Sequence, residues 1–171
     1  MKFFPLIVGF LMVFGCNSKP QSTTTVDDAK EKEANKITAK DIEKLKYTDY
    51  ILSLDSQNAV NNWLKYQELS TQMDLLKKAN LSFFKEEKKV METFIKDFKA
   101  ELPESTKTPT INARITVLET ALLKLHSTAK LINVDKKVLL KDIKDLLIAF
   151  ANLNLQINKK FELEAQEIDK P

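Results

Sequence analysis

The chain has 171 residues, 43% of them hydrophobic and 30% charged, which fits a single globular domain. Its 27 basic and 24 acidic residues nearly balance, so the charge does not point to a nucleic-acid partner. Both glycines, Gly9 and Gly15, stand near the start, and the lack of glycine further on argues against phosphate-binding loops, dinucleotide-binding folds and hairpin-rich sheets.

The chain begins with the pattern of a lipoprotein leader. Lys2 precedes an apolar run that ends at Phe14 and is shorter than the roughly 20 residues that span a bilayer. Residues 13–16 (VFGC) resemble the bacterial lipoprotein box, in which a small residue precedes a cysteine that becomes acylated. The resemblance implies that residues 1–15 are a signal peptide and that Cys16 carries several acyl chains, which anchor stably. The alternative is a secreted protein whose signal peptide ends near an ordinary cysteine.

Residues 16–36 are predicted to be the lipidated cysteine and a flexible tether. They include three threonines at 23–25 and a charged run at 27–33, and they have too few apolar side chains to form a core. A random chain of this length spans roughly 25 Å. Because Cys16 is the only cysteine, the folded part has no internal disulfide and is held by packing alone.

Residues 37–171 are predicted to form one helical domain. Thr38, with Asp41 at the third helical position, is expected to cap a short helical segment within residues 37–54. Apolar residues then recur at helical spacing in four longer segments, at about 56–79, 82–102, 109–131 and 135–168. We therefore predict an all-α fold, an antiparallel up-down-up-down four-helix bundle with a short extra N-terminal helix and a long last helix.

Two prolines and the helix lengths predict how the bundle is connected. Pro103 and Pro109 delimit the clearest loop, and Thr108 is expected to cap the helix after it. At 1.5 Å per residue the last helix is roughly 50 Å long and the others roughly 30–35 Å, so the last helix overhangs. We expect the N-terminal segment to enter at that end and pack near Phe161, Leu163 and Ile168. The loop at 103–109 would then face the membrane, and the turns near Asn80 and Asn133 would lie at the far tip.

Four short stretches resemble sequences of small helical lipoproteins from flavobacteria and other Bacteroidetes. They are residues 47–53 (YTDYILS), 81–85 (LSFFK), 109–120 (PTINARITVLET) and 153–160 (LNLQINKK). The resemblance implies a bacterial origin and a lipid anchor, and it implies no particular activity.

His126 is the only histidine and is a candidate metal or haem ligand. A bundle that holds two metal ions usually carries Glu-x-x-His on its inner face, but Glu119 stands seven residues before His126. Met73 or Met91 could join His126 at a haem. The favoured interpretation is a histidine on the helix flank beside Leu125, with no metal and no cofactor.

Arg114 is the only arginine and offers two-point pairing that lysine cannot. We predict an ion pair with Glu68 or Glu92 across the bundle; the alternative is a solvated side chain.

The aromatic residues Tyr47, Tyr50, Trp63 and Tyr66 are expected to pack in the core, although a ligand-binding or peptide-binding patch is the alternative.

The lone histidine has no recognisable nucleophile motif near it, so the sequence does not indicate an enzyme. We expect a lipid-anchored protein of the cell envelope with a structural or protein-interaction role; the alternative is a binding module for a small apolar ligand between the helices. The partners expected are the membrane, through lipidated Cys16, and a second protein, but not nucleic acid. Residues 17–21 (NSKPQ) lack the acidic run of surface-export signals, which favours the outer membrane and its periplasmic face.

Overall fold

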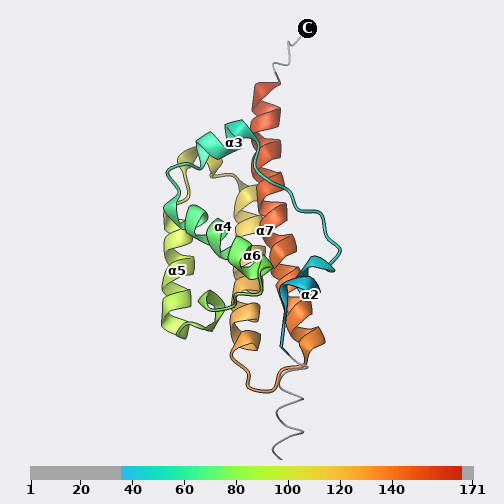
Figure 1. Ribbon diagram of the computed structural model, residues 1–171. Helices are drawn as coiled ribbons and strands as arrows, with labels where there is room; N and C mark the ends of the chain where they lie inside the picture. The colour runs from blue at the N-terminus through green and yellow to red at the C-terminus, as the bar shows by residue number, and fades with distance from the viewer. Residues whose placement is uncertain (1–35, 167–171) are drawn as a thin grey trace, which may run out of the picture.

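The computed structural model describes residues 36–166, and all regular structure in that range is helical (Figure 1). The helices are α2 (Ala39–Glu43), α3 (Leu54–Ala59), α4 (Leu64–Lys77), α5 (Lys88–Ala100), α6 (Pro109–Ala129) and α7 (Lys136–Ala165). Two short 3-10 turns, η1 (Phe83–Lys85) and η2 (Glu104–Thr106), precede α5 and α6. The predictions of an all-α fold and of a long last helix are confirmed.

Helices α6 and α7 form the centre of the fold and run antiparallel along each other (Figure 1). Thr108 caps α6, its hydroxyl accepting from the Ile111 amide at 3.2 Å, and Pro109 is the first helical residue, as predicted. Between the two helices lies a row of fully buried side chains, among them Ile111, Leu118, Leu125, Ile143, Leu146 and Leu153. Each contributes about 1.5–3 kcal/mol of burial free energy. This pair is the frame that the other helices cover.

The predicted helix at 56–79 is wrong, because the chain breaks between α3 and α4. The break contains Asn61 and Asn62, which favour turns, and ends at Trp63, which is 0% exposed. The indole N–H of Trp63 donates to the carbonyl of Phe98 at 2.8 Å, within the last turn of α5, where carbonyls lack helical partners. The break therefore lets the Trp63 side chain fill the core and give a hydrogen-bond donor to a free carbonyl at the end of α5.

The finer prediction of four antiparallel helices is not confirmed. In Figure 1 α5, α6 and α7 alternate in direction, but α4 crosses them obliquely. The second predicted helix, at 82–102, also starts later than expected, since residues 83–85 form the turn η1 and α5 begins at Lys88.

Helix α2 is held against the first turn of α7. Thr38 and Asp41 form the predicted capping box, in which the Asp41 carboxylate accepts from the Thr38 amide at 2.9 Å. Asp41 also pairs with Lys136, the first residue of α7, at 2.8 Å. The hydrogen bonds from Lys136 and Thr38 hold the pKa of Asp41 well below its usual range. Helix α2 thus lies at the start of α7.

Residues 44–53, here called the strap, have no regular structure and run beside α7 from α2 to α3 (Figure 1). Two asparagines one turn apart on α7 bind the strap's backbone. The Asn154 amide donates to the Tyr50 carbonyl at 2.9 Å. Asn158 donates to the Ile51 carbonyl at 2.8 Å and accepts from the Ser53 amide at 2.9 Å. These side chains supply the partners that a neighbouring strand would otherwise give.

The strap reverses the predicted entry of the chain. The N-terminal segment was expected to pack on the overhang of the last helix, but Ile37 and α2 lie at the opposite end, and only the end of the strap approaches the overhang. Phe161 packs partly buried against the core, Leu163 is exposed, and Ile168 lies outside the described residues. Lys36 therefore stands at the end that holds the turns near Asn80 and Asn133, away from the loop at 103–108.

We predict that Asn154→Ala lowers the free energy of unfolding by about 2–3 kcal/mol. The Asn154 side chain accepts from the buried hydroxyl of Tyr66 at 2.8 Å while it donates to Tyr50, so its loss leaves both groups without a partner. Urea denaturation followed by circular dichroism measures the change. Asn152→Ala on the same helix is the control and should cost less than about 0.5 kcal/mol. Equal losses in the two variants would show that the strap is not held through Asn154.

Candidate functional site

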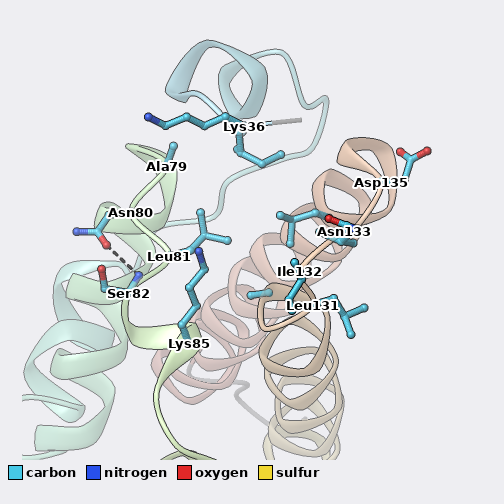
Figure 2. Close-up of a pocket in the computed structure, with 14 residues that line it drawn as sticks. Lys36, Ala79, Asn80, Leu81, Ser82, Lys85, Leu131, Ile132, Asn133 and Asp135 are labelled. Atoms are coloured by element: carbon cyan, nitrogen blue, oxygen red, sulfur yellow. Dashed lines mark hydrogen bonds between the residues drawn. The ribbon is translucent and has the colours of Figure 1, made fainter. Parts of the chain in front are cut away.

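A hollow of about 1130 Å³ opens at the end of the molecule where Lys36 lies (Figure 2). Three separate stretches line this tip hollow: residues 36–37, residues 79–85 and residues 129–139. Its apolar lining side chains are Ile37, Ala79, Leu81, Ala129, Leu131, Ile132, Val134 and Leu139. The hollow lies at the ends of the helices and not between two helices side by side. Its shape is therefore set by the turns that connect the helices.

The first wall of the tip hollow is the turn that ends α4. The Asn80 amide donates to the Leu75 carbonyl at 3.0 Å and the Ala79 amide to the Leu76 carbonyl at 2.8 Å, which is a Schellman motif. Ala79 occupies its left-handed position with a φ of 63°, the position where glycine is usual. Next, the Asn80 side-chain oxygen accepts from the Ser82 amide at 3.0 Å, as Figure 2 shows. This turn carries Leu81 and Lys85 to the hollow.

The second wall is the turn between α6 and α7. Asp135 caps α7 by accepting from the Lys137 amide at 2.6 Å, and its carboxylate points away from the hollow in Figure 2. Leu131 and Ile132 in the same turn are 60% and 91% exposed. Lys130 ties the two walls together by donating to the Glu86 carbonyl at 3.1 Å.

The tip hollow combines apolar walls with positive charge. Lys36 and Lys85 both line it, and Figure 2 shows the Lys85 side chain rising between the two turns. Its one acidic lining residue, Asp135, is occupied as the helix cap. The surface is therefore suited to a molecule with apolar parts and an anionic group.

His126 is buried and not on the helix flank as predicted. Its Nδ1 lies 3.2 Å from the Phe84 carbonyl, which can only accept, so that nitrogen must carry the proton of this bond. The bond fixes the turn η1 against α6. Within residues 36–166 no cluster of histidine, cysteine or carboxylate side chains could hold a metal ion.

Asp142 is a buried carboxylate between α6 and α7 that the sequence analysis missed. One oxygen accepts from the Thr128 hydroxyl at 2.7 Å. Lys124 lies 2.8 Å from the other, close enough for an ion pair although the angle is poor for a hydrogen bond. The contact with Asp142 raises the pKa of the Lys124 ammonium. The signal in the sequence was a carboxylate, Asp142, directly before Ile143 on the apolar face of a predicted helix. The cluster is structural, since its partners are all supplied within the helix pair.

The structure does not bring Arg114, Glu68 and Glu92 together, so the predicted ion pair is wrong. Arg114 is exposed on α6 and belongs to none of the ion pairs among the described residues. Glu68 pairs with Lys65 at 2.7 Å on α4, and Glu92 pairs with Lys88 at 3.5 Å on α5. Lysine supplies the bridge between α5 and α6 instead, through Lys99 and Glu119.

Of the four aromatic residues expected in the core, Trp63 and Tyr66 are buried there. The rings of Trp63 and Phe98 lie 4.5 Å apart between centroids, and those of Tyr66 and Phe150 lie 5.6 Å apart. Burial raises the pKa of Tyr66, whose hydroxyl donates to Asn154. Tyr47 and Tyr50 are half-buried on the strap.

Comparison with known proteins identifies no relative: no protein-family model matches the chain, and no curated protein or solved structure is similar to it. Among residues 36–166, each helix is too short or too polar to cross a bilayer. Cys16, the predicted lipidation site, lies outside the described residues.

We predict that Ala79→Gly raises the free energy of unfolding by about 0.5–1 kcal/mol, because glycine removes the clash of a side chain at a positive φ. Ala113→Gly, at an exposed position inside α6, is the matched control and should lower it by about 1 kcal/mol. Urea denaturation of both variants gives the comparison. A loss of stability in Ala79→Gly like that of the control would contradict the left-handed turn.

Proposed function

We propose that this protein is a lipid-anchored component of the cell envelope that acts by binding another protein and not by catalysis. The leader pattern and Cys16 support the anchor, together with the resemblance to small Bacteroidetes lipoproteins. The protein would lie on the outer membrane and face the periplasm, because residues 17–21 lack an acidic export signal.

The observation that carries the proposal is the position of Lys36, where the predicted tether joins the folded domain. Lys36 lies on the rim of the tip hollow. A tether of roughly 25 Å from Cys16 would hold this end near the bilayer. The tip with Asn80 and Asn133 then faces the membrane, and the loop at 103–108 points away from it, the reverse of the orientation expected from a continuous first helix.

The end away from the membrane offers the surface for a protein partner. The exposed apolar side chains Ile51 and Leu54 lie where the strap meets α3, and exposed Leu163 lies on the last turns of α7. These segments are at the same end of the molecule in Figure 1. A soluble partner reaches that end without approaching the bilayer.

The second candidate function, a binding module for a small apolar ligand, draws its support from the tip hollow. The ligand would bind at the helix ends instead of between the helices. A catalytic role has little support, because the lone histidine is occupied by the Phe84 carbonyl in the core.

The test of the anchor is Cys16→Ala, which we predict to leave the membrane fraction for the soluble fraction and to carry no acyl chains by mass spectrometry. Ser18→Ala, two residues away, is the control and should stay membrane-bound after a high-salt wash. If Cys16→Ala also stays membrane-bound after that wash, the lipid anchor is wrong.

A further inference from the structure

We infer that the tip hollow is a second membrane contact, which docks on the surface of a bilayer that contains anionic phospholipid. Ile132 and Leu131 would enter the interface, and the lysines around the hollow would contact the headgroup phosphates. The inference rests on the proposed function only for the anchor that brings this end to the bilayer.

The apolar part of the contact is the turn between α6 and α7. Ile132, at 91% exposure, is the most exposed large apolar side chain among the described residues, and Leu131 beside it is 60% exposed. Two adjacent apolar side chains at the end of a helix pair gain free energy by leaving water for the boundary between headgroups and acyl chains.

The charged part of the contact comes from lysines at the same end. Lys36 and Lys85 line the hollow, and Lys137 stands in the first turn of α7. Lys85 is exposed and makes no ion pair with a described residue. An anionic surface attracts lysines within a Debye length of it. By contrast, the loop at the opposite end has Glu101 and Glu104 beside its lysine, Lys107, and Lys107 pairs with Glu104. The end that the tether would bring to the membrane thus has in Lys85 a charge that no described carboxylate pairs, whereas the lysine of the opposite loop is paired.

The sequence of the predicted tether bears on what covers the tip hollow, the tether itself or lipid. It rejoins the fold at Lys36, on the rim of the hollow, twenty residues after Cys16. Within residues 17–35 the apolar side chains are Val26, Ala29 and Ala34, apart from the proline at 20, which is too little to fill an apolar hollow of this size. The tether is therefore a poor occupant, whereas headgroups and acyl chains lie within its reach.

The test uses tryptophan quenching by brominated lipids on the membrane-extracted protein, reconstituted in vesicles. Ile132→Trp places a reporter in the contact, and Leu163→Trp places a matched one at an exposed apolar position at the other end. The native Trp63 is fully buried and gives a constant background. In vesicles of brominated phosphatidylcholine with phosphatidylglycerol, we expect several-fold greater quenching at 132 than at 163.

Two comparisons test the lysine contacts. Quenching at 132 should fall in vesicles of brominated phosphatidylcholine alone, and it should also fall when Lys85→Glu is added to Ile132→Trp. Equal quenching at 132 and 163 would overturn the docking. Equal quenching at 132 in the two kinds of vesicle would overturn the role of anionic lipid.

Mass spectrometry of the same preparation separates this inference from the proposed function. A protein without acyl chains overturns the anchor, and its Cys16 thiol is then coupled to a maleimide lipid so that the quenching comparison still tests the tip. An acylated protein with equal quenching at the two ends overturns the tip contact and leaves the anchor in place.

Discussion

The hydrogen bonds between α7 and the strap determine how the rest of the molecule is arranged. Asn154 and Asn158 bond the backbone of residues 50–53, and Asp41 ties α2 to Lys136 at the other end of the same helix. An extended segment beside a helix has no neighbouring strand to pair with its backbone N–H and C=O groups. Without these side chains its peptide groups would remain unpaired wherever water is excluded. Because both ends of the segment are held, the chain must enter at the start of α7.

This entry point connects the fold to the proposed function. It puts Lys36 beside the turns that end α4 and α6, and these three stretches enclose the tip hollow. Leu131, Ile132 and Lys85 lie at that end, whereas the opposite end carries the exposed Ile51 and Leu54 and the projecting last turns of α7. An anchor at Cys16 would turn the first end to the membrane and leave the second for a protein partner.

Local signals predicted much of the helical content, and tertiary partners account for the errors. Thr108 and Pro109 marked the start of α6 because cap and proline act through neighbouring residues alone. The break before Trp63 depends on the distant Phe98 carbonyl, and helical spacing of apolar residues continues across it. The strap depends on Asn154 and Asn158, about a hundred residues away. The sequence did not predict the tip hollow, because turns remote in sequence form it. The prediction for Arg114 was wrong because being the only arginine says nothing about whether a residue is buried.

The central claim is that the chain enters the fold at the tip. Pulsed electron resonance distances between spin labels test it in a Cys16→Ala background, with Lys36→Cys paired with Asn133→Cys in one sample and with Ser105→Cys in another. The account predicts a short distance for 36 to 133, which share the rim of the hollow, and a much longer one for 36 to 105. A shorter distance from 36 to 105 than from 36 to 133 would contradict the strap, the orientation and the membrane contact together.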